Sequence, residues 1–393
     1  MSFVKRNTVL SSRAGRALPQ AKPPNAEKLQ PPPGVRPSPL DGRPTTSTGT
    51  ASLDQLLAGH NGLPLGTCLL LEEQGTTDFS GVLLRYYAAE GLVQGHQVHL
   101  VGYPPEWRRQ LPGVAQPDSK SSKSSKPAPA PEEKMKIAWR YEALGNSAAP
   151  GNVASREDAS QASFCHNFDL SKRLEPASIK GSLHPTPSTG PPTFDPRGQI
   201  TRSPLKAIIK HLQSKLLSSA PTEIHRVVIP SLLLPSFYAP QCSQPSEVLR
   251  FLHALRALLR TYSSQLTAII SLPTSLFPRS SGLVRWMELL SDGVLELVPL
   301  PATPGAAPPP ASSNAEKTDQ SQGLLKVHSL PVYHEKGGGG AETSTFRETL
   351  SFSLSMSKGL NIKPYSLPPM IEDEEEQKKE KASGGKPKDG IDF

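Results

Sequence analysis

The sequence predicts an α/β fold in which a mostly parallel, twisted sheet carries helices on both faces and ends in antiparallel edge strands. Short apolar runs alternate with helix-periodic segments between residues 66 and 299, and this alternation is typical of strand-helix-strand units. The first unit has an apolar strand at residues 67–71 and a helix at 82–90. Two final apolar segments, at 323–332 and 349–355, have no helix between them, which favours antiparallel pairing.

The elements between these ends follow the same alternation. A short strand is expected after the first helix, at residues 96–101, and an alternating segment lies at 164–170. Pro204 and Pro245 each open a helix-periodic segment, and proline is preferred there because the first helical N–H groups have no partner within the helix. Helices are therefore expected at 204–217, 245–262 and 283–291, and strands at 225–230, 265–272 and 293–299.

Low-complexity stretches interrupt this pattern, so one interrupted domain is expected. The chain has 393 residues, of which 43 are proline and only 36% are hydrophobic. Proline-rich and small polar segments cannot bury enough apolar surface to offset the entropy of ordering. The sequence predicts a disordered, proline-rich basic arm at 1–46, a domain at 47–371 and a disordered charged tail at 372–393. Low-complexity insertions are expected at 114–133, 146–162, 176–200, 301–321 and 336–344.

The charge balance favours a polyanionic partner without identifying it. The formal net charge is +8 and the pI is near 9.3, which suits association with nucleic acid, although disordered basic tails alone also account for it. Apolar runs fall short of the ~18 residues that span a bilayer. The three cysteines, Cys68, Cys165 and Cys242, are too far apart to indicate a disulfide framework or a paired metal site. We expect no membrane partner and a cytoplasmic and nuclear location.

The loop between the first strand and the first helix has the position of a phosphate-binding loop but lacks its key residues. A working loop reads G-x-x-x-x-G-K-[ST], in which the lysine neutralises the phosphates and the hydroxyl binds magnesium. Placed on Gly75, this template puts Ser80 at the second glycine, Gly81 at the lysine and Val82 at the hydroxyl. Tight nucleotide binding is not expected from such a loop.

The order and spacing of these first elements resemble the opening of RecA-like ATPase domains. Longer motifs resemble the family of the fourth Elongator subunit over about residues 34–371. These motifs are G-V-R-P-S at 34–38, T-G-T-x-S-L-D at 48–54, G-L-P-L-G at 62–66, L-E-E-Q at 71–74, A-E-G at 89–91, I-A-W-R-Y at 137–141, F-C-H-N-F-D-L at 164–170 and Y-S-L-P-P at 365–369.

The resemblance implies a RecA-like fold without standard Walker motifs. It also implies a hetero-hexameric accessory ring formed with the fifth and sixth Elongator subunits, association with the core subunits, and binding of tRNA during wobble-uridine modification. The radical chemistry of that modification belongs to a different subunit. Two other interpretations remain open: a divergent ATPase whose nucleotide sits at a subunit boundary and regulates tRNA binding or release, and a RecA relative that acts on DNA, which fits the fold but not the longer motifs.

Other groups that a RecA-like ATPase needs are also missing. The strand at 96–101 should end in a carboxylate that activates water, but Gly102 follows it. The strand at 225–230 should deliver an aspartate to the metal, but it ends in valine, isoleucine and proline. The acidic pair Glu72 and Glu73 is interpreted as a solvated strand end whose side chains point to opposite faces. These losses leave little electrostatic stabilisation for phosphoryl transfer, so we expect no enzymatic activity, no cofactor and no metal site.

Candidate RNA-binding residues follow from the resemblance. In RecA-like rings, the loops after the third and fourth core strands face the central pore. Here the first loop contains Phe237 and Tyr238, and the second contains Phe277 and Arg279, the only cation of that loop. Aromatic and cationic side chains together suit unstacked bases and phosphates, although these aromatics are equally suited to packing under their own loops. Arg108 and Arg109, next to Trp107, are the next candidates.

Overall fold

The computed structural model describes residues 31–57, 59–115, 163–186, 188, 193–194, 200–300, 321–331, 349–357 and 359–365. The described residues from Pro32 onward form one compact unit. The motif at 137–141, the charged tail and most of the expected insertions lie outside the described residues. Among the described helices, none is both long enough and apolar enough to cross a membrane.

A nine-stranded sheet forms the centre of the domain, in the order β16-β15-β14-β13-β4-β12-β11-β5-β8. Six neighbouring strands are parallel: β13 (Gly293–Pro299), β4 (Cys68–Glu73), β12 (Leu266–Pro273), β11 (His225–Ile229), β5 (Gln97–Val101) and β8 (Ser182–Thr186). Three antiparallel strands extend one edge: β14 (Gly323–Ser329), β15 (Leu350–Ser355) and β16 (Gly359–Pro364). The predicted α/β class is confirmed, and the arrangement is consistent with a RecA-like fold.

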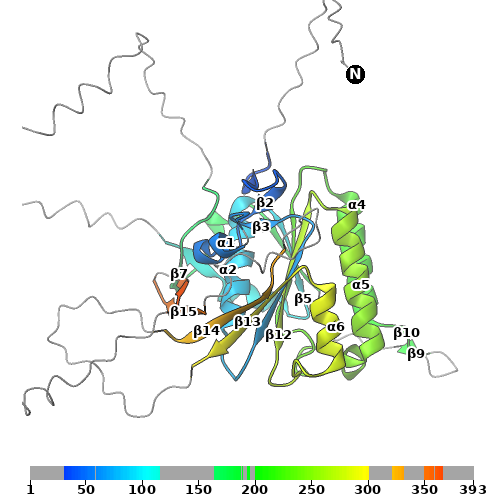
Figure 1. Cartoon of the computed structure of the whole chain (residues 1–393). Helices are drawn as coiled ribbons and strands as arrows, with labels where there is room; N and C mark the ends of the chain where they lie inside the picture. Colours follow the sequence, from blue (N-terminus) through cyan, green and yellow to red (C-terminus); the bar gives the residue numbers. More distant parts are fainter. Residues whose placement is uncertain are drawn as a thin grey trace, which may run out of the picture. The chain divides into compact units, whose positions relative to one another are not determined.

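Helices cover both faces of the sheet. On one face lies α2 (Phe79–Gln94), and on the other lie α4 (Pro204–Ser218), α5 (Pro245–Thr261) and α6 (Gly282–Leu290) (Figure 1). Alternate residues of β4 supply both cores: Leu69 and Leu71 pack on the α2 side, and Cys68 and Leu70 on the side of the other three helices. Such two-sided burial is why parallel strands appear in the sequence as continuous apolar runs.

Short strands also form where the sequence predicts disorder. Inside the expected arm at 1–46, β1 (Val35–Pro37) and β2 (Pro44–Thr46) pair with β3 (Leu63–Pro64). Inside the expected insertion at 176–200 lie the 3-10 turn η2 (Pro176–Ser178) and β8. These two predictions are wrong for the described residues, because a strand that hydrogen-bonds to existing backbone needs no apolar run of its own. The remaining short elements are α1 (Ala51–Leu56), η1 (Pro105–Gln110), β6 (Pro112–Val114), β7 (Phe168–Arg173), β9 (Thr193–Phe194), β10 (Ile200–Arg202) and η3 (Pro240–Ser243).

A buried arginine ties the amino-terminal residues to the sheet. Arg226, on β11, is fully buried, and its guanidinium donates to the carbonyl oxygens of Ser47 and Tyr87 at 2.8 and 3.0 Å. It also donates to the Thr46 hydroxyl at 2.6 Å and to His96 Nδ1 at 2.9 Å. A buried guanidinium without such partners would be very costly. The segment before α1 is therefore held in place by charge-assisted hydrogen bonds as well as by apolar packing.

Three imidazoles stack across neighbouring parallel strands. His225 on β11, His99 on β5 and His184 on β8 have ring centroids 5.2 Å apart in each adjacent pair. His99 Nε2 lies 2.9 Å from His225 Nδ1. Burial lowers the pKa of all three imidazoles, to about 4 for His225, and nearby positive groups, including Lys215, lower the pKa of His99 and His184 further.

We expect His225→Gln to weaken the acid sensitivity of the fold. A histidine with a lowered pKa in the folded state binds its proton only on unfolding, so acidification from pH 6.5 toward pH 4 favours unfolding. Asp54 and Glu72, whose pKa values burial raises to about 6 and about 7, act in the opposite direction, so the variant must be compared with the parent chain. Urea unfolding at pH 7 and at pH 5.5 measures the free energy of unfolding of both proteins. As the pH falls, this free energy should decrease by up to about 1.4 kcal/mol more per pH unit in the parent than in the variant. If the free energy of unfolding depended on pH identically in the two proteins, the prediction would be wrong.

Candidate functional site

The degenerate phosphate loop lies at the carboxyl end of β4, where the sequence predicts it. Gly75 keeps a positive φ of 82°, a conformation that glycine adopts readily. Ser80, Gly81 and Val82 belong to the first turns of α2 and are buried. A side chain added at Gly81 would overlap the Asp78 carboxylate. The position of the missing lysine therefore has no room for one unless Asp78 moves.

The carboxylate of Glu73 occupies the amino terminus of α2. Its Oε1 accepts hydrogen bonds from the backbone N–H of Phe79, at 2.8 Å, and from the hydroxyl of Thr77, at 2.7 Å. Its Oε2 accepts from the backbone N–H and the hydroxyl of Ser80, at 2.9 and 2.5 Å. Glu73 and Ser80 are each 5% exposed. Four donors thus converge on one buried carboxylate.

This arrangement puts a negative charge where a phosphate would bind. The N–H groups of the first helical turn attract anions, and phosphate-binding loops direct them at the nucleotide. Here the N–H groups of Phe79 and Ser80 are already paired within the chain, and the carboxylate repels a second anion. The interpretation of Glu73 as a solvated strand end is wrong, because the loop folds back over it and α2 covers its face of β4.

The positions expected for the catalytic carboxylates are closed as well. Gly102, which follows β5, has a φ of 83°, and a Cβ at this position would lie 2.5 Å from the hydroxyl oxygen of Tyr238. That tyrosine is 3% exposed, and its hydroxyl lies 3.4 Å from the carbonyl oxygen of Val101. Neither β5 nor β11 carries an acidic residue. The buried tyrosine fills the space that a water-activating acid would need.

Arg279 is surrounded by three carboxylates from three elements. Its Nε lies 2.8 Å from both Glu72 of β4 and Glu288 of α6, and its Nη1 lies 3.5 Å from Glu296 of β13. The Glu72, Glu288 and Glu296 side chains are 0%, 7% and 3% exposed. Burial raises the pKa of Glu72 to about 7, an effect that the Arg279 charge opposes. We call these four residues the Arg279 cluster.

The expectation of a free loop cation at Arg279 is therefore wrong. Its guanidinium compensates acids that come together only in the folded chain, and Glu72 is not a solvated strand end either. Turning Arg279 toward RNA would leave Glu72, which is 0% exposed, without a cationic partner among the described residues, and this is strongly unfavourable. Contact between this loop and RNA stays a prediction, but the structure gives Arg279 a structural role.

The aromatic side chains of the two expected RNA loops pack inward. Tyr238 is buried, which excludes base stacking by its ring in this conformation. Phe237 is half-buried and stacks on Tyr103 with ring centroids 4.0 Å apart. Phe277 is half-buried against the core beneath α4, α5 and α6. Of the sequence candidates for RNA contact, only Arg108 and Arg109 are exposed, both on η1.

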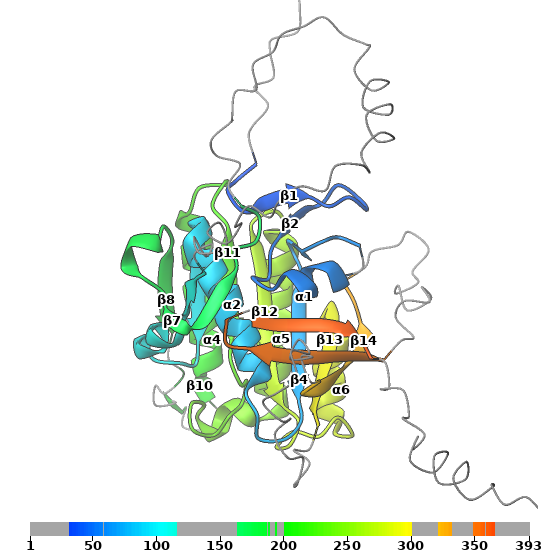
Figure 2. The same cartoon turned by 90° about the vertical axis from the view of Figure 1, so that its left-hand side faces the viewer.

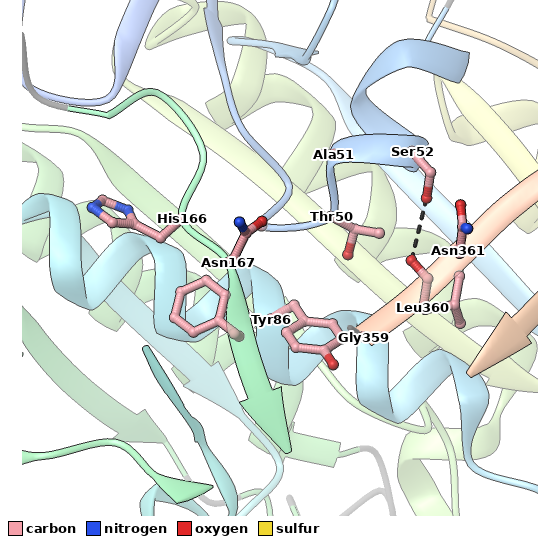
Figure 3. A pocket seen from close by; sticks show the side chains of 11 residues that line it. Thr50, Ala51, Ser52, Tyr86, His166, Asn167, Gly359, Leu360 and Asn361 are labelled. Atoms are coloured by element: carbon pink, nitrogen blue, oxygen red, sulfur yellow. Dashed lines mark hydrogen bonds between the residues drawn. The ribbon is translucent and has the colours of Figure 1, made fainter. Parts of the chain in front are cut away.

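A small cavity of about 140 Å³ lies between α1, α2 and β16 (Figure 3). The Thr50 and Tyr86 hydroxyls border it and are buried without a hydrogen-bond partner among the described residues. His166 also borders it, but its Nδ1 is paired with Glu90 at 3.0 Å. The residues around the cavity include no cysteine, lysine or carboxylate. The cavity therefore offers hydrogen-bonding groups but no arranged set of catalytic side chains.

Comparisons with known proteins find a family and several relatives that match most of the chain. Residues 28–393 match the family described as PAXNEB protein. The chain is 34% identical to Elongator complex protein 4 of Schizosaccharomyces pombe, a match that covers 95% of this chain and 96% of that protein. The proteins of the same name from Saccharomyces cerevisiae and Homo sapiens are 28% and 30% identical, over 77% and 67% of this chain and 70% and 65% of theirs.

Proposed function

The chain belongs to the PAXNEB family of Elongator complex protein 4 homologues, and on this premise we propose that it is a non-catalytic, RecA-like subunit of the Elongator accessory ring. In this role it assembles with the fifth and sixth Elongator subunits, and the ring associates with the core subunits in the cytoplasm and nucleus. It binds tRNA and supports modification of the wobble uridine. The chemistry itself takes place on another subunit.

The observation that carries the non-catalytic role is the pairing of Glu73 with the first turn of α2. A bound nucleotide would have to displace a buried carboxylate from four hydrogen bonds before its own phosphates found donors. Without the lysine, the metal ligands or the water-activating acid, little binding energy is available to drive that exchange. A nucleotide held at a subunit boundary meets the same obstacle, because this helix terminus is closed from within.

Exposed apolar side chains on α6 support the assembly part of the proposal. Trp286 and Leu289 lie one turn apart on this helix and are 55% and 54% exposed, and Leu276 in the preceding loop is 52% exposed. Large apolar side chains grouped on a surface are typical of association sites. Burial of this face against a neighbouring subunit would remove it from water.

We expect the full chain, co-expressed with the fifth and sixth Elongator subunits, to form a discrete particle that binds tRNA and neither binds nor hydrolyses ATP. Gly81→Lys should not create activity, because Asp78 obstructs the new side chain and Glu73 still occupies the helix terminus. Size-exclusion chromatography, tRNA titration, ATP titration and phosphate release measure these four properties. A particle that lacks residues 1–30 and 372–393 is the control for assembly and should remain intact.

Two results would overturn the proposal in different ways. ATP turnover by the particle that a substitution in residues 75–82 abolishes would favour a divergent ATPase. A discrete particle with no affinity for tRNA would instead remove the RNA-binding role and leave only the structural one.

A further inference from the structure

The fold brings three arginines together from two distant segments. Arg108 and Arg109 lie on η1, and Arg173 ends β7. The antiparallel pairing of β6 with β7 joins the segments, since Pro112 is opposite Arg173 and the N–H of Leu174 donates to the carbonyl oxygen of Leu111 at 3.0 Å. The Arg173 guanidinium also donates to the carbonyl oxygen of Arg109. We call Arg108, Arg109 and Arg173 the arginine triplet.

The charges of this triplet are not compensated. Within the described residues, none of the three guanidinium groups has a carboxylate within 4.0 Å. Among the described residues, several other exposed arginines are paired: Arg43 with Asp41, Arg250 with Glu247, Arg260 with Asp292, and Arg285 with Glu288. Guanidinium groups without a paired carboxylate attract an anionic partner, whereas a paired arginine offers little net field.

The triplet also lines a concave surface. A hollow of about 640 Å³ is bordered by the triplet together with Leu174 and Pro176. Arg108 lies between this hollow and a second one of about 370 Å³, which runs along the edge strand β8. The flank that carries β7 and β8 is at the left of Figure 2. The two hollows offer a track along one side of the domain.

The backbone under the triplet is held rigidly. Trp107, immediately before Arg108, is 3% exposed and packs into the core beneath α2. Pro105 fixes the start of η1, and the β6–β7 pairing fixes the position of Arg173. Because the anchoring residues already fix the backbone here, binding an anion needs to order only the arginine side chains.

We propose that the arginine triplet binds neighbouring phosphates of the RNA backbone, and this proposal rests on the proposed tRNA-binding function. Guanidinium groups match phosphate oxygens with paired N–H donors. Leu174 and Pro176 give the hollow an apolar border against which ribose can pack. The only aromatic side chain of η1, Trp107, is buried and does not stack on a base. The site therefore recognises the charge and spacing of the phosphates rather than the base sequence.

The test uses the full chain in a particle with the fifth and sixth Elongator subunits. The triple variant Arg108→Gln, Arg109→Gln, Arg173→Gln is compared with a control triple, Arg43→Gln, Arg250→Gln, Arg260→Gln, which removes the same charge from paired arginines. The triplet variant should bind tRNA about 100-fold more weakly near 0.1 M salt and lose about 2 to 3 units of the log–log salt slope, because three phosphate contacts disappear. The control should change affinity less than about threefold.

Each outcome has one interpretation. If the parent particle binds tRNA and the two triple variants reduce the affinity for tRNA equally, the triplet is not the phosphate site. The proposed function then still stands. If the parent particle does not bind tRNA, the proposed function itself fails. The acidic segment at 372–376 is an alternative partner within the chain. If removing residues 372–393 abolishes the difference between the two triple variants, the triplet serves that tail and not RNA.

Discussion

Glu73→Ala is expected to destabilise the fold by about 3 kcal/mol and, at the same time, to create a binding site for inorganic phosphate. The substitution removes the acceptor of four hydrogen bonds and leaves the N–H groups of Phe79 and Ser80 unpaired in a buried place. Unpaired buried donors cost roughly 1 to 3 kcal/mol each, and loss of the negative charge at the helix terminus adds to this. Phosphate should restore part of the lost stability, because it supplies the missing oxygens and charge.

The measurement is urea unfolding of the parent chain and of the variant, with and without inorganic phosphate, at constant ionic strength. The parent should show no specific response, since its own carboxylate already occupies the donors. Asp78→Ala is a matched control, because Asp78 is a neighbouring carboxylate that is 63% exposed and whose one ion pair among the described residues is with Arg85. The substitution Asp78→Ala should lower the free energy of unfolding by less than about 1 kcal/mol. Equal stability of parent and Glu73→Ala, or equal responses to phosphate, would show that Glu73 does not fill an anion site.

The parallel core of this fold could be predicted from the sequence because its signals are local. Apolar runs such as residues 266–272 and the prolines that open α4 and α5 each carry their own structural preference. The absence of a lysine is equally visible, since Gly81 stands at its position in the template. Strand alternation also places Glu72 and Glu73 on opposite faces of β4, and this is confirmed by their different partners.

The contacts that fill the site could not be predicted, because they join residues far apart in the chain. Glu72 and Arg279 meet across about 200 residues, and only the order of β4, β12 and β13 in the sheet brings them together. Arg173 lies 64 residues after Arg109, across a stretch without a core-forming pattern. Whether Glu73 faces water or a helix terminus depends on how residues 74–78 fold back, and composition does not specify that.

Two sets of charges that pair within the chain therefore lie at the carboxyl end of β4, one on each face. Glu73 satisfies the donors at the start of α2, and the Arg279 cluster lies on the opposite face of β4. The Glu73 carboxylate occupies the N–H groups that a phosphate would need. The Arg279 cluster makes the loop that is expected to contact RNA a part of the folded core. The pairing of both sets within the chain supports the proposed non-catalytic, structural role.

Arg279→Ala is accordingly expected to lower the free energy of unfolding by about 3 to 5 kcal/mol at pH 8, because it removes the counter-charge of Glu72, which is 0% exposed. A matched control is Arg285→Ala, which removes a guanidinium that is 66% exposed and, within the described part of the chain, pairs with Glu288 alone. This control should cost less than about 1 kcal/mol.

The pH dependence separates this explanation from a general loss of packing. The pKa of Glu72 is already raised to about 7 by burial, against an ordinary 4.5. The folded state therefore binds a proton between these values that the unfolded state has released, and stability falls as the pH rises through 7. Removing Arg279 takes away the positive charge that opposes this rise, so the variant should regain stability when the pH is lowered from 8 to 5.5. Urea unfolding at the two pH values measures this recovery. An Arg279→Ala chain as stable as its parent at both pH values, but impaired in tRNA binding within the ring, would instead return Arg279 to the role of an RNA contact.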